Sequence, residues 1–130
     1  MRSFTVAGAL ALIGGFGLMA IAEDKPKEIT VKGEIVDLAC WLEDGKIGAE
    51  HKKCATSCLK GGTPAGVLLE DGTVYLLVPH GSEGKVSPEL AGEMVEVKGK
   101  LLERGGLKGI TAKTIKKVEK GHEGSEGSGK

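Results

Sequence analysis

The chain has 130 residues with 18 basic and 18 acidic side chains, so its formal charge at pH 7 is zero. A neutral chain with only 3% aromatic residues lacks the basic, aromatic-lined groove that binds single-stranded nucleic acid. Its length is sufficient for one small domain with a modest core, and a second domain would not fit.

Residues 1–22 have the pattern of a secretory signal peptide. Arg2 precedes a continuous apolar run that ends in the A-x-A cleavage motif of Ala20 to Ala22. We expect cleavage before Glu23, a periplasmic or secreted protein, and no stable membrane insertion after cleavage. A retained membrane anchor is the alternative.

The mature chain is predicted to begin with a strand and a short helix. The segment from Ile29 to Leu38 alternates apolar and polar residues as a half-buried strand does, and Gly33 is predicted to mark a bulge or bend. Residues 43–48 are typical of a turn. A helix is then predicted over 49–60, because the glycine that follows it suits the end of a helix.

Four further elements follow before the end of the chain. Asp71 and Gly72 separate two apolar runs within 65–79, which predicts a hairpin with a type I′ turn. The sequence "SPELAG" at 87–92 predicts one or two helical turns. Residues 93–118 predict a fourth and a fifth strand, and the polar segment 119–130 predicts a disordered tail.

This order of elements resembles the OB-fold, a five-stranded Greek-key barrel with a helix between its third and fourth strands. The resemblance covers about Ile29 to Val118. It implies a mainly β domain over 23–118, with a helical insert at about 40–62 after the first strand. A further resemblance is to small exported bacterial OB-like proteins of unassigned function. It is carried by Asp37, Cys40-Trp41, Gly48, His51, Cys54-Ala55, Cys58, Gly62, Pro64 and Gly66.

The cysteines and one histidine form a candidate metal site. His51, Cys54 and Cys58 stand at positions i, i+3 and i+7, so a helix places them on one face. Cys40 is predicted to arrive from the end of the first strand and to form the core of the site with Cys54 and Cys58, with His51 as a fourth ligand or as the group that tunes them. The outer pair, His51 and Cys58, would be about 10.5 Å apart at Cα, so a complete four-ligand set is strained.

Three thiolates and an imidazole suit a single soft transition-metal ion, zinc or copper(I), and do not suit calcium or magnesium. The predicted function is therefore metal storage, delivery, sensing or structural stabilisation. Two alternatives stay open. Cys40 could form a disulfide with Cys54 or Cys58 in an exported protein-interaction module without metal, or the thiols could serve a redox role.

Other residues carry weaker signals. Asp37 could accept a hydrogen bond from a metal ligand, Trp41 could shield the site, and His80 could close an open coordination position. His122 lies in the tail and receives no role. We expect no enzyme activity, because no group is marked to orient a histidine base against a cysteine, and we expect a partner protein in the cell envelope.

Overall fold

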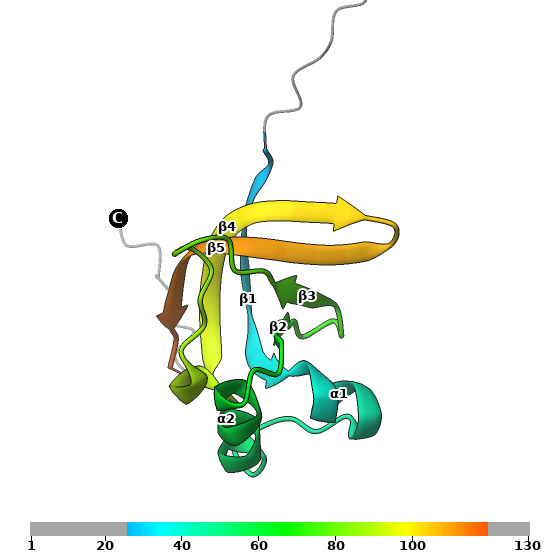
Figure 1. Cartoon of the computed structure of the whole chain (residues 1–130), viewed down its shortest axis with the longest axis vertical. Helices are drawn as coiled ribbons and strands as arrows, with labels where there is room; N and C mark the ends of the chain where they lie inside the picture. The colour runs from blue at the N-terminus through cyan, green and yellow to red at the C-terminus, as the bar shows by residue number, and fades with distance from the viewer. Residues whose placement is uncertain (1–25, 120–130) are drawn as a thin grey trace, which may run out of the picture.

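Five strands form a closed barrel in the computed structural model, which describes residues 26–119 (Figure 1). The strands follow the order β1-β2-β3-β5-β4, and β4 pairs back onto β1. Among the five strands within 26–119, only the β3–β5 pairing is parallel. The strands are β1 (Glu28–Asp37), β2 (Ala65–Leu68), β3 (Val74–Leu77), β4 (Met94–Arg104) and β5 (Leu107–Lys117). The prediction of a mainly β, five-stranded OB-like barrel is confirmed.

Three short helical elements connect the strands. Two of them, α1 (Leu38–Asp44) and α2 (Lys52–Lys60), form the insert between β1 and β2, at one end of the barrel (Figure 1). The third, the 3₁₀ helix η1 (Pro88–Leu90), lies between β3 and β4 as predicted. The predicted signal peptide at 1–22 and nearly all of the predicted tail lie outside the described residues. Within 26–119, no helix combines the length and apolar character needed to cross a membrane.

The path of the chain after β1 differs from the prediction. The sequence pattern extended the first strand through Leu38 and left Cys40 at its end, but the strand ends at Asp37 and Cys40 lies inside α1. The reason is local capping. Asp37 Oδ1 accepts a hydrogen bond from the Cys40 backbone N–H at 2.9 Å, and Gly45 ends the helix with a positive φ of 65°.

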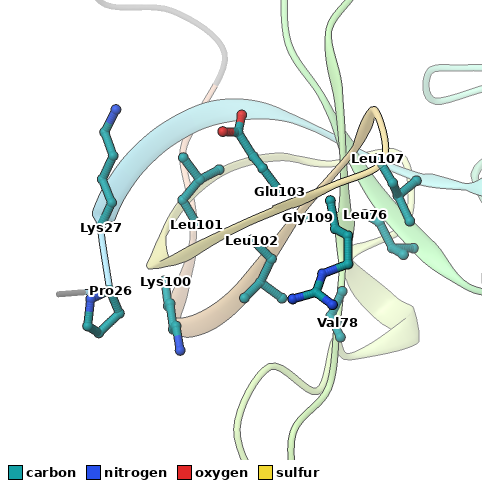
Figure 2. Close-up of a pocket in the computed structure, with 11 residues that line it drawn as sticks. Pro26, Lys27, Leu76, Val78, Lys100, Leu101, Leu102, Glu103, Leu107 and Gly109 are labelled. Atoms are coloured by element: carbon teal, nitrogen blue, oxygen red, sulfur yellow. The ribbon is translucent and has the colours of Figure 1, made fainter. Parts of the chain in front are cut away.

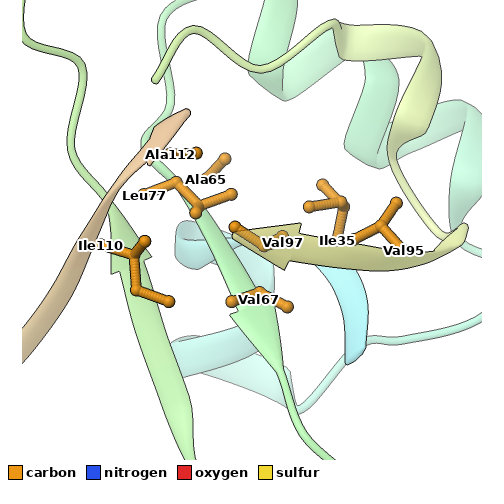
Figure 3. Packing of buried hydrophobic residues seen from close by; sticks show 8 residues of the cluster. All are labelled: Ile35, Ala65, Val67, Leu77, Val95, Val97, Ile110 and Ala112. Carbon is orange, nitrogen blue, oxygen red and sulfur yellow. The ribbon is translucent and has the colours of Figure 1, made fainter. Parts of the chain in front are cut away.

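The barrel is filled by small and branched apolar side chains from all five strands (Figure 3). Val67, Val95 and Ile110 are completely buried, and burial of each such side chain contributes roughly 1.5–3 kcal/mol. The core cluster comprises Ile35, Ala65, Val67, Leu77, Val95, Val97, Ile110 and Ala112. These short side chains allow a barrel of only five strands to close.

Two glycines let the strands approach closely. A Cβ atom at Gly33 would lie 2.3 Å from the backbone oxygen of Leu68, and one at Gly99 would lie 2.2 Å from the backbone oxygen of Thr111. Gly99 also stands at a shift of register between β4 and β5. Only a residue without a side chain fits at either position.

The β2–β3 hairpin exists, but its turn is not the predicted two-residue type. Leu69 closes the turn, because its oxygen accepts from Gly72 N–H and its N–H donates to the oxygen of Thr73. Gly72 has a φ of 85° and follows the two central turn residues. The loop therefore has three residues, with glycine in the left-handed position of a bulge.

Candidate metal centre

The insert brings the predicted ligands together from two helices. His51 is the N-cap of α2, and Cys54 and Cys58 follow on that helix; it begins at Lys52, not at Ala49 as predicted. Residues 48–51 form a separate turn, in which His51 N–H donates to Gly48 oxygen at 3.1 Å. The buried side chain of Ala55 anchors the helix to the rest of the protein.

Ion pairs fix α2 against the segment that contains η1. Lys52 pairs with Glu93, which immediately precedes β4, and Lys60 pairs with Glu89 of η1 at 2.9 Å. These pairs are partly exposed, and each contributes at most about 1 kcal/mol. They orient the helix so that its cysteines face the end of β1 and the start of α1.

Asp37 is the buried centre of this arrangement. Its side chain has 0% exposure, and besides capping α1 through Oδ1 it places Oδ2 3.2 Å from Nε2 of His51. A buried carboxylate is costly unless its oxygens are paired. Asp37 therefore fixes two elements at once, the backbone of Cys40 and the ring of His51.

The potential ligand atoms fall into two groups that share Cys40. In one, the ligand atoms of Cys40, His51 and Cys54 all lie within 4.8 Å of one another, and in the other those of Asp37, Cys40 and Cys58 do so. In a tetrahedral site with metal–sulfur bonds of 2.3 Å, two sulfurs are about 3.8 Å apart, so small side-chain rotations suffice. The described residues contain no group that holds all four predicted ligands, in line with the strain expected between His51 and Cys58.

The three cysteines differ in exposure and in acidity. Cys40 and Cys58 are half-buried, Cys54 is exposed, and all three are free thiols. Hydrogen bonding to Asp37, with smaller contributions from burial and from Cys58, raises the pKa of the Cys40 thiol to about 12. Burial raises the pKa of the Cys58 thiol, while its hydrogen bond with Cys40 acts in the opposite direction. Without a bound cation, Cys40 is therefore a protonated thiol at neutral pH.

The remaining predicted residues do not join either group. His80 is exposed in the loop after β3, where its backbone pairs with that of Glu83. Trp41 is half-buried on α1. His122 lies beyond the residues that the structure describes.

The sequence interpretation underestimated the role of Asp37, which both caps α1 and contacts His51. The segment "DLACWLEDG" contains the signal, an aspartate three residues before Cys40 and a glycine at the end, which together mark a capped helix. The contact between Asp37 and His51 joins residues 14 positions apart, and no local pattern predicts it.

A large cavity of the described chain has no cysteine in its lining (Figure 2). It has a volume of about 580 Å³ between the start of β1, the end of β3 and the outer half of the β4–β5 hairpin. Its wall combines apolar side chains such as Leu102 and Leu107 with the charged Lys100 and Glu103. Because Lys27 lines it and Asp37 lies at the far end of β1, the cavity and the thiols occupy opposite ends of the barrel.

Comparisons with protein-family models, with curated proteins and with solved structures found no match to this chain. The function is therefore argued from the cysteine and histidine cluster alone.

Proposed function

We propose that this protein binds one soft transition-metal ion, zinc or copper(I), through Cys40, His51 and Cys54. The observation that carries the proposal is the mutual approach of these three ligand atoms, from two separate helices, to within 4.8 Å. Two thiolates and an imidazole form a donor set that both metals accept.

The hydrogen bond to Asp37 supports this assignment by selecting one nitrogen of the histidine. Asp37 Oδ2 accepts from Nε2 of His51, so the neutral ring carries its proton there and leaves Nδ1 for the metal ion. This is the usual way in which a carboxylate orients a metal-binding histidine and increases its basicity.

The exposure of Cys54 favours delivery or sensing over a purely structural role. Structural zinc sites are closed by four protein ligands, whereas this group has three ligands and one of them is exposed to solvent. An incoming thiol or imidazole could reach the ion at that side and take it over. We therefore propose that the protein carries its ion for transfer to a partner protein in the cell envelope.

Metal titration of the reduced protein, expressed from its full sequence, tests the proposal. We expect one ion bound through Cys40, His51 and Cys54, and a loss of at least tenfold in affinity in Cys54→Ser and His51→Ala. His80→Ala, which removes an exposed histidine outside the cluster, is the matched control and should bind as the wild type does. Absence of binding in the wild type, or equal binding by His51→Ala, would contradict the proposal.

The alternative is a disulfide-stabilised interaction module without metal. Two observations favour it: the Cys40 sulfur lies within 4.8 Å of the sulfurs of both Cys54 and Cys58, and two large apolar residues of the insert, Leu42 and Ile47, are 71% and 52% exposed. Titration of free thiols in the unreduced protein, together with elemental analysis, separates the two functions. Two unreactive cysteines without metal would indicate the interaction module.

A further inference from the structure

Cys58 has no role in the proposed three-ligand site, yet it belongs to a second set of potential ligands. Its sulfur, the sulfur of Cys40 and a carboxylate oxygen of Asp37 all lie within 4.8 Å of one another. Cys40 is common to both sets. A thiolate can bond two metal ions at once, because its sulfur has more than one lone pair.

One ion would need a strained site to use the whole cluster. His51 and Cys58 would be about 10.5 Å apart at Cα on a helix, and no group among the described residues brings the ligand atoms of all four predicted residues together. Two ions that share Cys40 avoid this strain. His51 and Cys54 then serve one ion, and Cys58 with Asp37 serves the other.

The burial of Asp37 gives an independent reason for a second cation. Its carboxylate has 0% exposure, and within the part of the chain that the structure describes its one potential cationic partner is His51. When His51 binds the first ion its ring is neutral, and the thiolates of Cys40 and Cys54 offset the charge of that ion, so no net positive charge remains beside the buried carboxylate. Buried carboxylates are ordinarily paired or coordinate a metal.

Asp37 also keeps the capacity to bind an ion. An ionised carboxylate has about four lone-pair positions, and the hydrogen bonds to the Cys40 backbone N–H and to the His51 ring occupy two of them. The thiol of Cys40, which also hydrogen-bonds to this carboxylate, loses its proton when metal binds and frees that position.

We propose that a second metal ion binds to Asp37, Cys40 and Cys58, and that the Cys40 thiolate bridges it to the first ion. This inference rests on the proposed function, since the Cys40 thiolate can bridge two ions only if it also binds the first ion. The second ion is a divalent one such as zinc, because a carboxylate ligand disfavours copper(I). On binding, the thiol of Cys58 releases its proton to solvent and becomes a thiolate ligand. Two ions on one sulfur would lie about 3–4 Å apart.

Cobalt(II) titration of the reduced full-length protein, with zinc as the competing ion, tests the second site. We expect two ions per chain in the wild type and one in Cys58→Ser. His80→Ala, the matched control, should keep two. Electron paramagnetic resonance adds a measurement that needs no variant: the high-spin cobalt signal should grow with the first equivalent and weaken with the second, because a bridging thiolate couples the two spins.

The possible outcomes separate this inference from the function on which it rests. One ion in both the wild type and Cys58→Ser overturns the second site and leaves the proposed function intact. Two ions that persist in Cys58→Ser, or two ions whose spins do not couple, also overturn it, because the second ion then binds elsewhere. Absence of bound cobalt or zinc in the wild type overturns the second site together with the zinc form of the proposed function, and the copper(I) form is then decided by copper(I) titration of the same protein.

Discussion

Replacement of Asp37 by asparagine separates the two roles of this residue. Asparagine caps helices about as well as aspartate, so its oxygen keeps the 2.9 Å hydrogen bond from the Cys40 N–H, and we expect stability to fall by less than about 1 kcal/mol. Toward His51, the amide NH₂ takes the place of Oδ2. It donates to Nε2, which moves the ring proton to Nδ1, the nitrogen that the metal needs.

The expected effect on metal binding is much larger than that on folding. Loss of the partner that orients a metal-binding histidine typically lowers affinity 10–100-fold, which is about 1.4–2.7 kcal/mol. Competition with a chromophoric chelator measures the affinity, and urea unfolding followed by circular dichroism measures the stability. In Asp37→Ala the cap is lost as well, so stability should fall by a further 0.5–2 kcal/mol or so.

The tautomer of His51 gives a readout that a merely structural change would not alter. Nitrogen NMR of the metal-free protein should show the proton on Nε2 in the wild type and on Nδ1 in Asp37→Asn. If Asp37→Asn binds the first ion with wild-type affinity, then Asp37 does not act through the ring of His51, and the reasoning is refuted.

Three further predictions concern the barrel and the thiols. Gly33→Ala should lower the free energy of unfolding by about 3 kcal/mol or more, because its Cβ would lie 2.3 Å from a backbone oxygen. Gly61→Ala, whose Cβ would have its nearest neighbour at 3.4 Å, should change that free energy by less than about 1 kcal/mol in urea unfolding. Equal losses in the two variants would contradict this reasoning. In the same assay, Ile110→Ala should lower the free energy of unfolding by roughly 2–5 kcal/mol, because Ile110 is completely buried. Replacement of Leu107, which is 63% exposed, by alanine should lower it by less than about 0.5 kcal/mol. Unchanged stability of Ile110→Ala would show that the core is misassigned. Metal affinity should rise with pH across the neutral range, because the pKa of Cys40 is about 12 and the ion must displace the thiol proton. The expected slope is roughly tenfold per pH unit for each thiol proton displaced. An affinity that does not change with pH, measured by chelator competition, would argue against Cys40 as a ligand.

The strands were predictable because each one carries its own signal. Alternating apolar and polar residues indicate β1 and β4, and glycines in the turns indicate the hairpins. The number and order of the strands could therefore be predicted from residues close together in the chain. The shift at the end of β1 was missed because the alternation from Ile29 continues one residue past the capping Asp37. The alternating pattern of a strand and the capping residue of a helix overlap at Asp37, and the hydrogen bond from this cap starts the helix.

The candidate site was predictable in its residue types and only partly in its geometry. Helical spacing placed His51 and Cys54 together and indicated the strain toward Cys58. The division into two groups depends on where Cys40 and Asp37 lie, and that depends on contacts across 14 residues or more of chain. Such contacts depend on packing at the end of the barrel, and no periodic pattern in the sequence indicates them.

The separation between the barrel and its insert has a consequence for hydrogen exchange. The β1–β4 and β3–β5 ladders join residues that are distant in the chain, so their amides should exchange only when the whole domain opens. All the proposed ligands lie between residues 37 and 58, and α2 is held by the buried Ala55, by the half-buried Leu59 that packs against the core, and by two partly exposed ion pairs. Local detachment of α2 would expose its amides while the ladders stay protected, and an ion could leave through that opening without the protein unfolding.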